Sequence, residues 1–186
     1  MAISFEAGEL IFTGIWILVR LFVWIKNRRV DWKREALLLL MYINLAVIIR
    51  ITFFPRALVD GRVQPLVFDA ASAYPFRINL IPFVRLGDYR YKSDLMRNVI
   101  GNVGLFIPTG IILPIIYKKL NSFGKVIGAG ALISLGIEIL QLPFSVRASD
   151  VDDLIMNTAG VAVGYGIYAV ARALKRRHAA RKQAAV

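Results

Sequence analysis

The stretch IEILQLPFSVRASDVDDLIMNTAG, residues 137–160, places many polar groups in a hydrophobic setting. Its two ends are apolar enough to lie in a membrane. Within twenty residues, however, it carries Glu138, Gln141, Arg147, Asp150, Asp152, Asp153 and Asn157. An ionisable side chain inside a bilayer is costly, and it is usually kept because it has a partner or a function. The stretch therefore predicts the end of one membrane helix and the start of the next, with a polar layer where they meet.

The rest of the chain has the composition of an integral membrane protein. Of its 186 residues, 58% belong to the hydrophobic set and only 19% are charged. Hydropathy predicts five spans, at residues 10–25, 36–54, 98–117, 123–143 and 153–173. Each is near the length that crosses about 30 Å of hydrocarbon at 1.5 Å per residue. We expect an all-α, polytopic transmembrane helix bundle that forms a single domain over residues 1–186.

The basic residues predict the orientation of this bundle. Segments 26–35, 118–125 and the chain from Arg172 onward hold five, three and six Lys or Arg residues. The N-terminus, loop 55–97 and loop 144–152 hold none, seven and one. Short loops rich in Lys and Arg stay in the cytoplasm, so we expect the N-terminus outside and the C-terminus inside. The basic tail, residues 173–186, is then a topology anchor beside anionic lipid, and we expect no nucleic-acid partner.

The polar residues of the predicted spans gather at one depth, the outer one. This layer consists of Arg50, Asn98, Asn102, Glu138, Gln141, Asp153 and Asn157. The main exceptions are Arg20, which we expect to extend its side chain toward the inner surface, and Asn44 in mid-span. One polar layer that faces the outside is the strongest signal in the sequence.

Helical spacing places these groups on shared faces. Ser134, Glu138 and Gln141 lie on one face of the fourth span, and Asp153 and Asn157 lie on one face of the fifth. The pairs Gly160-x-x-x-Gly164 and Gly124-x-x-x-Gly128 predict close approach between helices, because small residues mark packed faces in lipid. A packed bundle beneath a polar layer predicts a recess at its outer end.

Loop 55–97 is long for a connection and rich in aromatic and arginine residues. These include Tyr74, Phe76, Arg77, Phe83, Arg85, Tyr89, Arg90 and Tyr91. Its stretch FRINLIPF, residues 76–83, contains an Ile-Pro step that disfavours a helix just before Pro82. We therefore expect re-entrant or interfacial backbone that roofs the recess.

Carboxylates are the candidate chemical groups of the layer. The chain has no cysteine and one histidine, His178 in the basic tail, so thiol and histidine chemistry are excluded from the spans. Glu138 and Asp153 are the candidate general bases. Glu138 could equally form a buried ion pair with Arg50 or Arg147, and the sequence does not separate these roles.

The three aspartates at 150, 152 and 153 also have a structural interpretation. Ser149 followed by Asp152 resembles a capping box at the start of a helix. The spacing Asp150-x-Asp152-Asp153 lacks the glycine of a calcium-binding loop. We expect neither a metal nor a cofactor.

The order of motifs resembles the VanZ-like family of bacterial membrane proteins. The motifs are NLIPF (79–83), RNVIGNVGLFIPTG (97–110), IEILQ (137–141), R-x-x-D-V-D-D-L-I-x-N-T-x-G (147–160) and Gly164-Tyr165. The resemblance covers most of residues 36–172. By matching position, the polar motif residues of the family fall on Asn79, Asn98, Asn102, Glu138, Gln141, Arg147, Asp150, Asp153 and Asn157.

The resemblance implies a place in the bacterial cytoplasmic membrane and an accessory role in glycopeptide resistance, associated with reduced susceptibility to teicoplanin. No reaction is established for the family. We expect the outer polar layer to engage an amphiphile, either a lipoglycopeptide or a cell-wall lipid. Two alternatives stay open. One is an intramembrane enzyme that modifies a polyprenyl or lipid-phosphate headgroup, with Arg147 binding phosphate, and the other is a structural partner of another envelope protein. The oligomeric state is also open.

Overall fold

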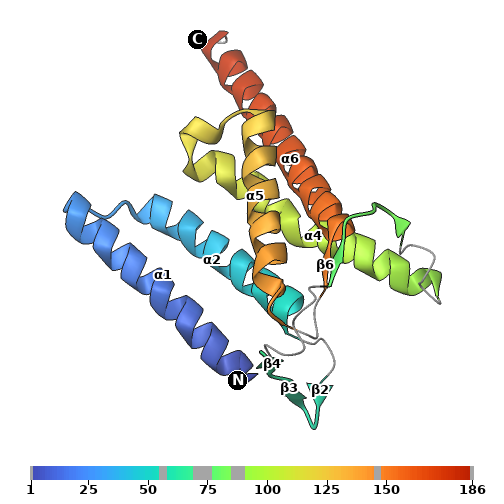
Figure 1. The fold of residues 1–186 in the computed structure, drawn as a ribbon. Helices are drawn as coiled ribbons and strands as arrows, with labels where there is room; N and C mark the ends of the chain where they lie inside the picture. Colours follow the sequence, from blue (N-terminus) through green and yellow to red (C-terminus); the bar gives the residue numbers. More distant parts are fainter. Residues whose placement is uncertain (1, 55–57, 69–76, 85–90, 145–147, 185–186) are drawn as a thin grey trace.

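A computed structural model describes residues 2–54, 58–68, 77–84, 91–144 and 148–184 (Figure 1). It contains five helices that are long and apolar enough to cross a membrane. They are α1 (Phe5–Asn27), α2 (Trp32–Phe53), α4 (Lys92–Ile116), α5 (Phe123–Gln141) and α6 (Val151–Ala184). A short 3₁₀ helix, η2 (Lys118–Leu120), joins α4 to α5. The predicted all-α architecture with five candidate spans is confirmed.

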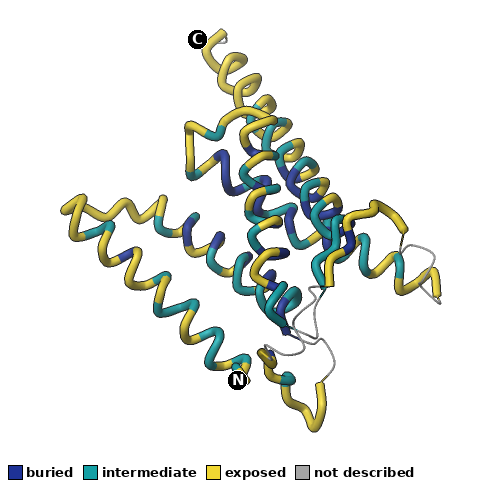
Figure 2. Tube along the Cα trace, viewed as in Figure 1, coloured by how far each residue is buried: buried dark blue, intermediate teal, exposed yellow. Residues whose placement is uncertain are grey.

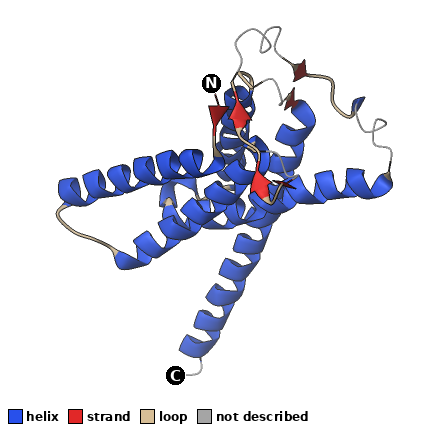
Figure 3. Cartoon of the chain, turned by 90° about the horizontal axis from the view of Figure 1, so that it is seen from below, coloured by secondary structure: helices blue, strands red, loops and turns tan. Residues whose placement is uncertain are grey.

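Local signals set the helix ends that hydropathy does not detect. Ser4 caps α1 by accepting a hydrogen bond from Ala7 N at 3.2 Å, and Asp31 caps α2 through the backbone N–H groups of Lys33 and Arg34. Helix α4 begins at Lys92 rather than at Asn98. Helix α6 continues to Ala184, so most of the basic tail is a helical extension that projects away from the bundle (Figure 3).

The described segments before and between the helices form three pairs of two-residue strands. Strand β1 (Ala2–Ile3) pairs antiparallel with β4 (Leu66–Val67), and β2 (Leu58–Val59) pairs antiparallel with β3 (Arg62–Val63). The β2–β3 turn is Asp60-Gly61, and both residues have positive φ, as a tight hairpin turn of this kind requires. Strand β5 (Ile78–Asn79) pairs parallel with β6 (Ser149–Asp150).

Helices α4 and α6 approach each other closely through glycines. A Cβ atom at Gly160 would collide with the Val103 carbonyl oxygen, and one at Gly164 would collide with the Ile107 carbonyl oxygen. The predicted packing role of Gly160 and Gly164 is therefore confirmed. The same prediction for Gly124 and Gly128 is wrong, because no described neighbouring atom comes within 4 Å of a Cβ built at either. In α5 the close approach occurs at Gly130, against the side chain of Val161.

The core lies among α2, α4, α5 and α6, whereas α1 lies at the edge (Figure 2). Phe106 and Ile48 are fully buried in this core. In α1 the buried residue is Arg20. Its side chain extends as expected toward the α1–α2 turn, where Glu35 lies in the first turn of α2, but it is buried there rather than exposed. Its Nε lies 2.9 Å from Glu35 Oε2 and its Nη2 lies 2.5 Å from Glu35 Oε1, so a buried ion pair joins α1 to α2.

Candidate functional site

The parallel pair β5–β6 brings two polar motifs together that lie far apart in the sequence. Asn79 is the register partner of Asp150, and Ser149 N donates to Arg77 O at 2.9 Å. Asn79 Nδ2 also donates to Asp150 Oδ1 at 3.0 Å. A backbone ladder and a side-chain hydrogen bond therefore fix the loop to the start of α6.

Asp150 is the residue that caps α6. It precedes the first helical residue, and its Oδ1 accepts a hydrogen bond from Asp152 N at 3.0 Å. The predicted capping box of Ser149 and Asp152 is wrong, because Ser149 lies in β6. Asp152 instead accepts from Phe83 N at 2.8 Å and is only 4% exposed. Its carboxylate holds the loop rather than the helix end.

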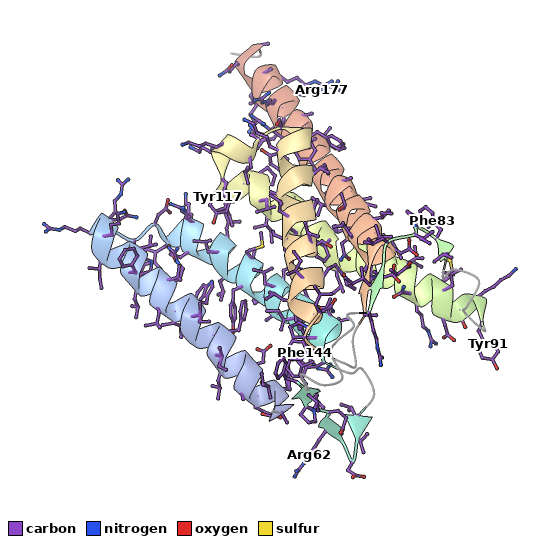
Figure 4. The ribbon with its side chains drawn as sticks, viewed as in Figure 1. Arg62, Phe83, Tyr91, Tyr117, Phe144 and Arg177 are labelled. Carbon is purple, nitrogen blue, oxygen red and sulfur yellow. The ribbon has the colours of Figure 1, made fainter. Side chains whose placement is uncertain are left out.

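Residues 77–84 cover the start of α6. Asn79 Oδ1 accepts a hydrogen bond from Ile81 N at 3.2 Å, which shapes the turn after β5. Phe83 has a φ of 64°, and the hydrogen bond from its N–H to Asp152 accompanies this left-handed conformation. Figure 4 shows Phe83 beside the first turns of α6. Residues 80–84 thus follow an irregular path beside the polar residues at the start of α6.

Glu138 is the buried carboxyl of α5 and is 4% exposed. Its Oε2 accepts a hydrogen bond from Asp150 N at 2.9 Å, and the Ser149 side chain also hydrogen-bonds to it. Asp153 and Asp150 lie close enough to repel its negative charge. No described Lys or Arg forms an ion pair with Glu138. The expected pairing with Arg50 is not formed, and Arg147 lies outside the described residues.

A second set of contacts lies deeper along α5 and α6. Asn102 Nδ2 donates to Asp153 Oδ1 at 2.5 Å, which connects α4 to α6. Asn157 Nδ2 donates to Ser134 Oγ at 2.9 Å, which connects α6 to α5. Asn157 is 2% exposed, and its Oδ1 has no hydrogen-bond partner within the described part of the chain. The helical faces predicted from spacing therefore do meet.

We call the residues joined by these contacts the polar cluster. It consists of Asn79, Asn102, Ser134, Glu138, Asp150, Asp152, Asp153 and Asn157. Sequence reasoning gave Asp152 a capping role and missed its hold on the loop. Two separate motifs could have suggested the contact between Phe83 and Asp152. They are N-L-I-P-F at residues 79–83 and the acid-rich helix start at residues 150–153.

Three predicted residues lie beside the polar cluster rather than in it. Gln141 Nε2 donates to Thr52 O at 2.6 Å and ties α5 to α2. Arg50 Nη1 lies 3.5 Å from Phe54 O, at the end of α2. Asn98 is half-buried one turn before Asn102 on α4.

Asn44, the polar residue in mid-span, has a structural role. Its Nδ2 donates to Leu105 O at 2.9 Å, and its Oδ1 accepts from Thr109 Oγ1 at 2.7 Å. Both contacts flank Pro108 in α4, where proline removes one helical hydrogen bond. Polar contacts from a neighbouring helix make such a proline tolerable inside a membrane.

The polar cluster is rich in hydrogen-bond acceptors. It holds four carboxyl groups, and the donors that the described residues direct at them include amide side chains, backbone N–H groups and the Ser149 side chain. In the described residues, no group of three or more His, Cys, Asp or Glu side chains could hold a metal ion. The cluster is therefore chemically suited to a ligand that donates hydrogen bonds.

Comparison with known proteins gives two matches. A family model described as VanZ/LLP1 matches residues 36–172, a range that includes the polar cluster and excludes α1. A protein from Enterococcus faecium named Protein VanZ is 32% identical over 111 residues, which cover 60% of this chain and 64% of that protein. The matched region thus spans less than two thirds of this relative. No solved structure matches.

Proposed function

This chain belongs to the VanZ/LLP1 family of multi-pass membrane proteins, and we propose from this premise that it is an accessory factor in resistance to lipoglycopeptides such as teicoplanin. Its site of action is the polar cluster, which engages an amphiphile at the membrane surface. The amphiphile is either the lipoglycopeptide or a cell-wall lipid.

The observation that carries this proposal is the burial of Glu138. The carboxyl is 4% exposed, two further acids lie near it, and no described cation pairs with it. Burial of a carboxyl beside two further acids costs free energy, because the carboxyl has lost most of its hydration. An ionisable group kept inside a membrane protein at this cost indicates a functional site.

The chemistry of the cluster favours a particular kind of headgroup. Acceptor-rich surfaces bind hydroxyl, amide and amine donors, which a glycopeptide or a glycan-bearing cell-wall lipid presents in number. The ligand enters beside residues 77–84, which cover the cluster and are held through Asn79 and Asp152. The bilayer around the helices receives the apolar tail of the ligand.

The distribution of charge supports an outward-facing cluster. The two ends of the bundle differ in basic residues, with η2, the start of α5 and the tail of α6 at the end opposite the polar cluster. Short basic segments remain in the cytoplasm. On this orientation the polar cluster lies at the level of the outer headgroups.

The double variant Glu138→Gln with Asp150→Asn tests the proposal in a sensitive Gram-positive host. Both amides keep an oxygen that can accept the hydrogen bonds from Asp150 N and Asp152 N, so the fold is retained while two negative charges are removed. We expect the wild-type protein to lower teicoplanin susceptibility while vancomycin susceptibility is unchanged. We expect the double variant to restore full teicoplanin susceptibility at a matched membrane level.

The matched control carries the same chemical changes away from the cluster, as Glu9→Gln with Asp60→Asn. Glu9 lies on α1, and Asp60 lies in the β2–β3 turn, where asparagine tolerates the positive φ. The control variant should lower the teicoplanin susceptibility of the host as much as the wild type does. Protection retained by the cluster variant at equal membrane level would refute the proposed role of the acids.

A further inference from the structure

An apolar groove separate from the polar cluster lies between α1, α2 and α5. Its volume is about 530 Å³, which falls within the range of roughly 300–1,000 Å³ for small-molecule sites. It is lined by Ile11 and Ile15 from α1, by Ile49 in α2 and Phe54 just after it, and by Leu140 in α5 and Phe144 just after it. Phe144 marks its end near the N-terminus of the chain (Figure 4).

The length of the groove matches one leaflet of a bilayer. Its lining on α2 runs from Leu45 to Phe54, which at 1.5 Å per residue is about 14 Å. The hydrocarbon core of a bilayer is about 30 Å thick, so the length of the groove corresponds to about one leaflet. A groove of this length and composition suits one hydrocarbon chain that lies parallel to the helices.

A positive charge lies at the surface end of this groove. Phe54 lines the groove, and Arg50 Nη1 lies 3.5 Å from its carbonyl oxygen. The Arg50 guanidinium carbon lies 5.3 Å from the ring centroid of Phe5, in cation–π geometry. These two contacts fix the guanidinium where the headgroup of a lipid would be if its chain filled the groove. Arginine is well suited to a phosphate group, because its planar donors match the phosphate oxygens.

We propose that this groove binds an acyl chain of an anionic phospholipid, with the lipid phosphate at Arg50. This site is independent of the proposed function, because it shares no residue with the polar cluster. The occupant is a lipid of the surrounding leaflet, and the positive charge selects it from zwitterionic lipids.

The experiment titrates the purified full-length protein in detergent with phosphatidylglycerol and with phosphatidylcholine of the same chain length, and it measures bound lipid by native mass spectrometry. We expect the wild type to prefer phosphatidylglycerol by about ten-fold, the typical strength of a charged hydrogen bond. Arg50→Gln should remove this preference, and Arg50→Lys should keep most of it because the charge remains.

The groove itself is tested with two identical substitutions on α1. A Cβ at Gly8 would lie 3.1 Å from Phe54 Cζ, so Gly8→Leu fills the groove. Gly14 does not line the groove and has no described neighbouring atom within 4 Å of a Cβ, so Gly14→Leu is the matched control. We expect Gly8→Leu to weaken the binding of both lipids by about ten-fold. Gly14→Leu should leave the binding of both lipids unchanged. A second pair, Ile15→Phe in the groove and Leu18→Phe outside it, covers the case in which Gly8→Leu does not fold.

Three outcomes would overturn the proposal. One is equal binding of the two lipids by the wild type, and another is equal effects of the groove variants and their controls. The third is a groove variant that loses self-association while its lipid binding is unchanged, since this would assign the groove to a second copy of the chain. None of these outcomes depends on antibiotic susceptibility, so the lipid site and the proposed function can fail separately.

Discussion

At the scale of single residues, the sequence predicted which polar side chains gather but not which of them pair. The sequence placed Glu138, Asn102, Asp153 and Asn157 at one level, and the structure brings them together. The partner of Asn79 depends on the short β5–β6 pair, whose two strands come from distant parts of the sequence. Such a pairing has no periodic signal, because two residues per strand are too few to show alternation. Because Ser149 pairs within β6, Asp150 rather than Ser149 caps α6.

Asn79→Asp should destabilise the protein more than Asn79→Ala does. The aspartate would place a second carboxylate about 3 Å from Asp150 Oδ1, where the amide now donates a hydrogen bond. We expect a loss of about 2–4 kcal/mol, measured as thermal unfolding in detergent, because a buried charge is left beside a like charge. Asn121→Asp is the control. There the amide oxygen accepts from Arg172 and Tyr168, a role that a carboxylate keeps. Equal effects at the two sites would contradict this account.

At the scale of helices, hydropathy gave the number and approximate limits of the spans, because the apolar stretches are long and separated by charges. It missed the polar ends of α4 and α6, since these turns continue the helix without adding hydrophobicity. The glycine pattern identified the packed face of α6 and misassigned that of α5. Spacing alone does not tell which glycine faces a neighbour.

Gly164→Ala should therefore separate α4 from α6, whereas Gly166→Ala should not. A Cβ at Gly164 would collide with the Ile107 carbonyl oxygen, and backbone atoms in a packed helix pair have little room to move. We expect Gly164→Ala to lower stability by about 2–3 kcal/mol. Gly166 has no described neighbouring atom within 4 Å of a Cβ, so alanine there should be neutral or raise stability by up to about 1 kcal/mol through helix propensity. Thermal unfolding of both purified variants in the same detergent compares them directly. An unchanged Gly164→Ala protein would mean that this helix pair is looser than the structure indicates.

At the scale of the whole molecule, the bundle is asymmetric along its long axis. The polar cluster and the strand pairs occupy one end, and the basic extension of α6 projects from the other (Figures 1 and 3). The positive-inside rule relates this asymmetry to the membrane, because basic segments are difficult to translocate. A ligand in the outer leaflet reaches the polar cluster only in the orientation with the N-terminus outside. The proposed resistance function therefore depends on a topology that can be measured alone.

The absence of cysteine allows that measurement with single substitutions. Ser93 is exposed in the first turn of α4, and Ser122 is exposed just before α5, so Ser→Cys changes each surface by one atom. We expect Ser93→Cys to react with a membrane-impermeant maleimide in intact cells and Ser122→Cys to react only after permeabilisation. Ser4→Cys, at the start of α1, should behave like Ser93→Cys because α1 and α2 place both on the same side. The reverse labelling pattern would put the polar cluster on the cytoplasmic side. It would then leave the fold and the lipid groove in place but exclude an extracellular ligand, because the acids would face the leaflet that a glycopeptide does not reach.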